Sequence, residues 1–164
     1  MSVRKLTLDP HPMLRAAARP VDTFDGDLRR LAHDLFETMY AHDGIGLAAP
    51  QIGCGLAVFV ANPSQQPGKE LVLVNPVLTS CRGRASVTEG CLSLPKVWHK
   101  VGRAARVSMT GRDPSGRELS IEADGLLAIV LQHEFDHLQG RLFVDRLSWF
   151  SRRRMQRRAA AACV

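Results

Sequence analysis

The segment QHEFDHLQG, residues 132–140, contains two histidines four residues apart, with a glutamate directly after the first. A helix places residues i and i+4 on one face, so the imidazoles of His133 and His137 could reach one metal ion. Glu134, one step around the helix, could then accept the proton of a metal-bound water. The alternative is a pair of ordinary helix histidines, and a metal site requires a third ligand.

The third ligand is expected upstream of this motif. The longer zinc-protease signature would place a histidine where the chain has Phe143, and no glutamate follows Glu134. Asp145 is the remaining acid and lies after the predicted end of the helix. Cys91, in EGCLSLP (89–95), is the best candidate, because a thiolate and two imidazoles form a three-ligand site for Zn²⁺ or Fe²⁺. From spacing alone, other residues compete with it: Cys54, Cys81, His11, His33, His42 and His99.

The composition is that of an ordinary soluble globular protein. The 164 residues suffice for one domain with a buried core, and 45% of them are hydrophobic and 23% charged. No apolar run is long enough to span a membrane, and MSVRKLTLDPHPMLR at the start contains no stretch typical of a signal peptide. The four cysteines show no C-x-x-C spacing and are sparse for a disulfide scaffold. We therefore expect a cytoplasmic protein with no membrane partner.

Hydrophobic periodicity predicts the elements that must position these residues. An apolar stripe predicts a helix from about Asp27 to Ala41, and residues 56–61 and 71–74 are predicted as buried strands. Residues 105–111 and 117–123 alternate around RDPSG, which is typical of a hairpin. A helix with apolar residues almost all round is predicted from near Asp124 to Gly140 and should be buried. A last helix is predicted from Ser148 to about Ala162.

This order of elements predicts an α+β fold, with small antiparallel sheets packed around a buried central helix that carries the H-E-x-x-H motif, and a C-terminal helix. Within the central helix, Asp136 is expected to be a surface acid, and the alternative is a residue that supports the metal ligands from behind. Gly90 and Pro95 indicate a shaped backbone around Cys91 rather than a regular strand interior.

A third motif connects the first two. The glycine-rich GIGLAAPQIG (44–53) lacks the spacing of a phosphate-binding loop. With EGCLS (89–93) and HEFDH (133–137), it makes the chain resemble the peptide deformylases, whose hallmark motifs are G-x-G-x-A-A-x-Q, E-G-C-x-S and H-E-x-x-H in this order. The resemblance extends from about Leu6 to Leu147. It implies a catalytic domain over residues 1–147, with residues 148–164 as a basic C-terminal helix of the same single domain.

The resemblance implies removal of the formyl group from the N-terminal formyl-methionine of newly synthesised proteins, with release of formate. Its metal ligands would be Cys91, His133 and His137, holding Fe²⁺, with Zn²⁺, Ni²⁺ or Co²⁺ as possible substitutes. Glu134 would take the proton of the attacking water and deliver it to the leaving amine. The Gln51 amide and the Leu92 backbone N–H would stabilise the oxyanion. The family also suggests a pair of Glu89 with Arg103 that holds the cysteine loop.

The resemblance also implies that the formylated peptide lies as an extended strand beside Gly46 and the loop after Cys91. The face of His133 and three aliphatic residues are candidates for the methionine pocket, although each aliphatic residue is also a typical core residue: Ile45, Val87 and Val130. The better-known bacterial members carry an arginine where this chain has Trp98. Because that arginine helps to hold the peptide backbone, the departure concerns substrate affinity and not the metal chemistry.

The positive charge is concentrated at the C-terminus. From Arg146 onward there are six arginines and no acid, which accounts for the whole formal charge of +6. Such a helix could contact ribosomal RNA near the emerging nascent chain, and a merely solvated helix is the alternative. We expect a monomer. Two other functions stay open: a metallopeptidase that cleaves internal bonds, and a catalytically weak paralogue with altered substrate preference.

Overall fold

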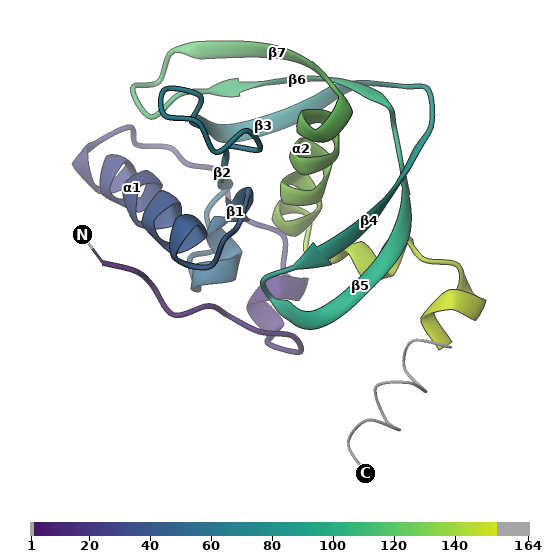
Figure 1. The fold of residues 1–164 in the computed structure, drawn as a ribbon. Helices are drawn as coiled ribbons and strands as arrows, with labels where there is room; N and C mark the ends of the chain where they lie inside the picture. Colours follow the sequence, from purple (N-terminus) through teal and green to yellow (C-terminus); the bar gives the residue numbers. More distant parts are fainter. Residues whose placement is uncertain (1, 154–164) are drawn as a thin grey trace.

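The computed structural model of this protein describes residues 2–153. Its elements follow the chain in the order shown by colour in Figure 1. They are η1 (Pro12–Arg15), α1 (Gly26–Ala41), β1 (Gly46–Ala48), η2 (Ala49–Ile52), β2 (Val58–Ala61), β3 (Leu71–Arg82), β4 (Ala85–Cys91), β5 (Leu94–Arg103), β6 (Arg106–Arg112), β7 (Glu118–Asp124), α2 (Gly125–Leu138) and η3 (Phe143–Arg146).

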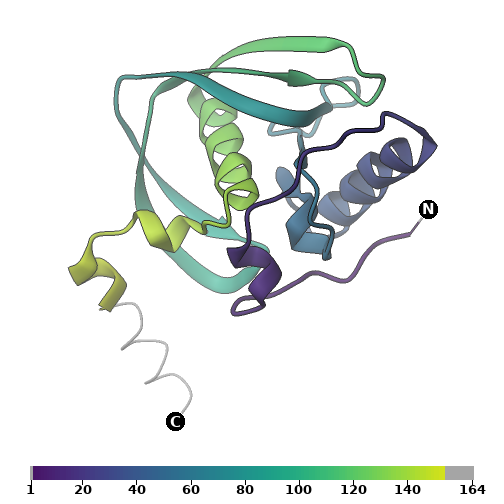
Figure 2. The same ribbon diagram turned by 180° about the vertical axis from the view of Figure 1, so that it is seen from behind.

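The strands form two antiparallel sheets. One has five strands in the order β1-β2-β3-β6-β7, and the other is the β4–β5 pair. In both views α2 runs between the β4–β5 pair and the larger sheet, whereas α1 lies beyond β1 and β2 (Figures 1 and 2). The predicted α+β class, with small antiparallel sheets around a central helix, is confirmed.

Side-chain alternation along β2 divides the core into two parts. Val58 and Val60 pack with residues of α1, while Phe59 between them packs with residues of α2. All three side chains are fully buried, because a strand that separates two helices has no solvent-facing side. The expectation of a buried strand here is confirmed, and the strand covers residues 58–61 rather than 56–61.

The two helices occupy the predicted segments. Asp25 caps α1 by accepting hydrogen bonds from the backbone N–H groups of Asp27 and Leu28. The helix α2 is buried over most of its circumference, as its apolar composition predicts. Gly140, just after its end, has φ +67, and a Cβ there would lie 2.6 Å from the Arg15 carbonyl oxygen. Only glycine fits where the chain leaves α2 against η1.

Two sequence-based expectations need correction. The segment 71–74 is the beginning of a strand that continues to residue 82. Cys91 ends a regular strand, β4, and the expected irregularity is a register shift between Gly90 and Cys91. This strand has no continuous apolar run, because Ser86 and Thr88 face solvent and Glu89 and Gly90 follow them.

At the C-terminus, residues 149–153 are helical, and the remainder of the helix predicted to about Ala162 lies outside the described residues. Within residues 2–153, no helix has the length and apolar character needed to cross a membrane.

Candidate metal centre

Three predicted ligands from two elements converge. Cys91 ends β4, and His133 and His137 lie one turn apart on α2. One ligand atom from each lies within 4.8 Å of the others, and the Cys91 Sγ is 3.3 Å from the His137 Nε2. Within residues 2–153, none of the competing cysteines and histidines joins this cluster. The second group with suitable atoms is His33, Asp34 and Glu37 on α1, and it lies at the surface.

Neighbouring side chains orient His133. Its Nδ1 lies 2.8 Å from the Glu89 Oε2, which leaves Nε2 for a metal ion. The ring of Phe143 stacks on the imidazole, with the two centroids 6.2 Å apart and the ring planes at 22° to each other. The imidazole is therefore held on one edge by a carboxylate and on one face by an aromatic ring.

Glu89 is itself held by Arg103, as the family resemblance suggests. The Arg103 Nε and one terminal nitrogen donate to the two carboxylate oxygens at 2.6 and 2.8 Å. Burial alone would raise the pKa of Glu89, but the hydrogen bonds from Arg103 and His133 outweigh burial and lower its pKa to about 2. Glu89 is thus an ionised acceptor for His133 at any physiological pH.

Asp136 is not the surface acid that its place in the helix suggests. It is 2% exposed and accepts hydrogen bonds from Arg103 and Arg146. The residue faces the interior because α2 is covered on this side by β5 and by the segment after α2, each of which contributes an arginine. Arg146, counted in the sequence as the first charge of the basic tail, is 36% exposed, but its guanidinium reaches the buried Asp136 carboxylate.

The electrostatics of the cluster suit a cation. Burial opposes charge on His133, but hydrogen bonds with Cys91 and Glu89 raise its pKa to about 10. Burial and the positive charge of His133 lower the pKa of His137, so its ring is neutral. A positive charge is therefore favoured among these groups, and a metal ion would supply it. A thiolate with two imidazoles is a donor set used by Zn²⁺ and Fe²⁺, so the residues present fit such an ion.

Glu134 lies beside this cluster and is 3% exposed. Its Oε2 is buried and has no hydrogen-bond partner among the described residues. Burial raises its pKa to about 7. A Cβ on Gly46 would lie 2.5 Å from its Oε1 and 2.8 Å from a methyl carbon of Val130. The backbone of β1 therefore runs directly over the carboxylate, and a glycine permits that approach.

The two predicted oxyanion donors lie next to Cys91. The Gln51 side-chain oxygen accepts from the Ala48 N–H at 2.8 Å, which fixes the amide. Its nitrogen then lies 3.6 Å from the Cys91 Sγ and 3.3 Å from the Ser93 Oγ. Leu92 follows Cys91 in the turn between β4 and β5. Ser93 is fully buried, and sequence reasoning missed it because a serine in the motif resembles any turn residue.

The predicted peptide-binding residues lie on three elements: β1 and the residue before it, β4, and α2. Ile45 and Gly46 belong to the segment at β1, which pairs only with β2 among the described strands, and Val87 lies in β4, which pairs with β5. Val130 lies on α2, where it contacts the Gly46 backbone. Trp98 is 69% exposed, and its ring covers Gly90, where an added Cβ would lie 2.6 Å from a ring carbon.

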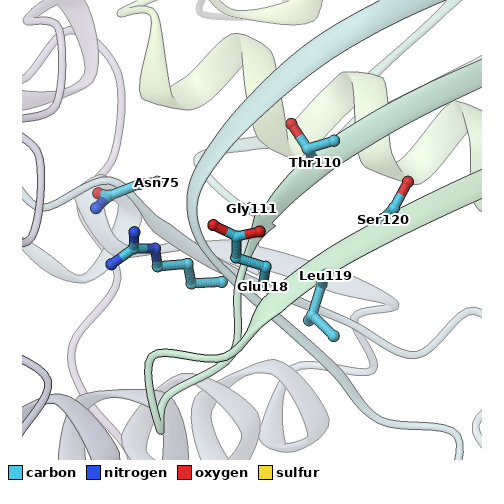
Figure 3. Close-up of a pocket in the computed structure, with 7 residues that line it drawn as sticks. Asn75, Thr110, Gly111, Glu118, Leu119 and Ser120 are labelled. Carbon is cyan, nitrogen blue, oxygen red and sulfur yellow. The ribbon is translucent and has the colours of Figure 1, made fainter.

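A separate hollow lies on the larger sheet, where β3, β6 and β7 run together (Figure 3). It has a volume of about 430 Å³ and is lined by Asn75, Thr110, Gly111, Arg112, Glu118, Leu119 and Ser120. None of the predicted site residues lines it. The hollow therefore does not belong to the candidate metal centre.

Comparison with known proteins identifies the family of this chain. Residues 3–153 match the model of the polypeptide deformylase family. A peptide deformylase of Alkalilimnicola ehrlichii is 44% identical over 159 residues, which cover 96% of this chain and 89% of that relative. The crystal structure of a peptide deformylase from Legionella pneumophila is similar with a TM-score of 0.91 and 43% identity, covering 95% of this chain and 92% of that chain. The peptide deformylase of Thermus thermophilus gives a TM-score of 0.91 and 42% identity, covering 97% and 94%. The match over nearly the whole length shows that this chain belongs to the peptide deformylase family.

Proposed function

We propose that Cys91, His133 and His137 hold Fe²⁺ and that Glu134 carries the proton during deformylation. The protein is a metal-dependent hydrolase of the peptide deformylase family, which removes the formyl group from the N-terminus of newly synthesised proteins. The observation that carries the proposal is the convergence of one thiol and two imidazoles beside a buried carboxylate. Zn²⁺, Ni²⁺ and Co²⁺ are proposed as substitutes, because the same ligands accept them.

When bound by Cys91, His133 and His137, the metal ion would supply Lewis-acid activation of water and of the formyl carbonyl. Glu134 accepts a proton from the attacking water, which its pKa of about 7 favours at neutral pH. The formyl carbon gains the oxygen, its bond to the amine nitrogen breaks, and Glu134 returns the proton to that nitrogen. The products are formate and a free N-terminal amine. The Gln51 amide and the Leu92 N–H are proposed to stabilise the oxyanion, supported by the position of Gln51 beside Cys91.

The substrate is proposed to lie as an extended strand along the free edge of β1, near Gly46. Main-chain pairing of this kind accepts many sequences, as an enzyme acting on most new proteins requires. Ile45, Val87 and Val130 are proposed to contact the methionine side chain. Trp98 stands where the family resemblance implies an arginine, so peptide affinity here is proposed to depend on an exposed aromatic surface instead of a charge.

Formate release tests this function directly. The Fe²⁺-loaded protein should release formate from formyl-Met-Ala-Ser and should not cleave the unformylated tripeptide. Cleavage of internal peptide bonds would instead indicate the metallopeptidase, and full metal occupancy without turnover would indicate the catalytically weak paralogue. The family match favours neither alternative.

The ribosome is a proposed partner, through the basic C-terminal segment. Trp149 and Phe150 are 62% and 79% exposed and contact each other edge to face. The guanidinium of Arg153 lies 5.0 Å from the Trp149 ring centroid. An exposed aromatic pair among arginines suits a surface of RNA and protein, and Arg154, Arg157 and Arg158 lie beyond the described residues. Because Arg146 is engaged with Asp136 and Arg152 with Asp145, the proposed contact begins at Arg153.

Deletion of residues 151–164 tests the ribosome proposal. The truncated protein should co-sediment less with ribosomes at low salt, while turnover of a short formyl peptide persists, because every proposed catalytic residue precedes this segment. Equal co-sedimentation of both proteins would reject the contact. We also propose that the protein acts in the cytoplasm as a monomer, and sedimentation of the purified protein would check the oligomeric state.

A further inference from the structure

A network of charged side chains connects the proposed metal ligands to the segment that follows α2; all of its members except Arg146, which is 36% exposed, are buried or nearly so. The Arg103 side chain is fully buried and donates to both Glu89 and Asp136. Arg146 approaches Asp136 from the other side, with its Nε 2.5 Å from Oδ2 and a terminal nitrogen 2.5 Å from Oδ1. The order of contacts is thus His133, Glu89, Arg103, Asp136 and Arg146.

The charges in this network balance. Two carboxylates, Glu89 and Asp136, face two guanidinium groups, and both carboxylates are 5% exposed or less. Without Arg146, one guanidinium would serve two buried carboxylates. Arg103 would then be drawn toward Asp136, which would have lost both of its other hydrogen bonds, and away from Glu89. The planar guanidinium of Arg146 donates to both oxygens of Asp136 and so prevents this competition.

The short helix η3, which contains Arg146, contacts the proposed metal centre at a second residue, His133. Phe143 begins η3 and stacks on the His133 ring, and Arg146 ends η3 on Asp136. Asp136 lies on α2 between the two histidines, and its main-chain oxygen accepts from the N–H of Arg141 as the chain turns back. The segment after α2 therefore holds the helix and one imidazole together.

We propose that Arg146 is a positioning residue for the metal centre. By satisfying Asp136 it leaves Arg103 free to hold Glu89, and Glu89 fixes the orientation of the His133 imidazole. This inference rests on the proposed ligand set. It assigns a role to a residue that lies outside the three sequence motifs and follows Asp136 by ten residues.

Metal binding by Arg146→Met tests the proposal. Arg141→Met is the matched control, because Arg141 lies in the same segment and its exposed side chain has no ion pair within residues 2–153. Co²⁺ affinity is measured for metal-depleted protein by competition with a chelator, and the Co²⁺ absorption spectrum is recorded at saturation. Loss of a partner behind a metal ligand weakens binding by about 10–100-fold. Because Arg146 acts through Asp136, Arg103 and Glu89, we expect a loss at the lower end of this range in Arg146→Met, about 10-fold, with shifted Co²⁺ bands, and wild-type values in Arg141→Met.

Arg146→Lys and Arg146→Gln complete the experiment, with folding checked by circular dichroism. Lysine restores the charge without the fork, so it should recover part of the affinity, and glutamine should recover less. Co²⁺ affinity within about threefold of wild type, with an unchanged spectrum, in folded Arg146→Met or Arg146→Gln would overturn the inference. Cys91→Ala is measured in parallel. If it keeps its affinity, the ligand set is wrong, whereas loss in Cys91→Ala alone rejects only the role of Arg146.

Discussion

Gly46→Ala should move the Glu134 carboxylate without changing the proposed metal ligands. The added Cβ would lie 2.5 Å from the Glu134 Oε1, 3.0 Å from its carboxyl carbon and 2.8 Å from a Val130 methyl carbon. Ordinary contacts begin at 3.4 Å, so the carboxylate or β1 must move by about 1 Å. Glu134 is 3% exposed and Val130 lies against the same added Cβ, so the carboxylate has little room for that movement.

The expected losses of rate and of stability in Gly46→Ala follow from this displacement. A misplacement of about 1 Å in a reacting group costs on the order of 10²-fold in rate. Forcing a methyl group into a packed core costs about 1–3 kcal/mol of stability. We therefore expect kcat to fall on the order of 10²-fold at saturating formyl-Met-Ala-Ser, with metal content unchanged. Gly46 also lies in the proposed peptide-binding strand, so KM and kcat must be measured separately.

Gly102→Ala is the control, because Gly102 also lies in a strand and a Cβ there meets nothing within 4 Å. It should retain wild-type turnover. If Gly46→Ala keeps kcat within about threefold of wild type, the carboxylate under β1 does not carry the proton, and the reasoning fails. A rise in KM with unchanged kcat counts against it equally, because that result would limit Gly46 to peptide binding.

Two further predictions concern the metal and its support. Cys91→Ala should lose stoichiometric metal, because two imidazoles form an incomplete site. Cys81→Ala, at an exposed position in β3, should keep its metal and serves as the control. Metal analysis showing full occupancy in Cys91→Ala would show that Cys91 is not a ligand. Arg103→Met should lower the free energy of unfolding by about 3–5 kcal/mol, because it leaves two buried carboxylates with fewer partners, and a loss below about 1 kcal/mol in urea unfolding would contradict the buried network.

Local features of this site can be predicted from the sequence, and its long-range contacts cannot. The spacing of His133 and His137 places them on one face of any helix, so their proximity follows from helix geometry. Cys91 makes its contact across 46 residues of chain, and spacing alone leaves it among several candidates unless the three motifs are taken together. The position of Gly46 over Glu134 is a matter of packing, for which a glycine-rich motif gives no direction.

The contact between Asp136 and Arg146 also could not be predicted from the sequence. The sequence predicts Asp136 at the surface and Arg146 in the basic C-terminal tail, because each is charged and no partner for either is evident from its neighbours in sequence. The chain turns back after Gly140 and brings the two together across ten residues. Periodicity describes one element at a time, so a contact made by such a turn becomes visible only in the structure.

Turnover and metal content measured together on Glu134→Gln test the central claim most directly. The glutamine is nearly isosteric and is not a proposed ligand, so the variant should bind metal with the same stoichiometry as the wild type. It should release formate from formyl-Met-Ala-Ser at least about 10²-fold more slowly, because proton transfer is lost. Near wild-type formate release by the fully loaded variant would show that Glu134 does not carry the proton.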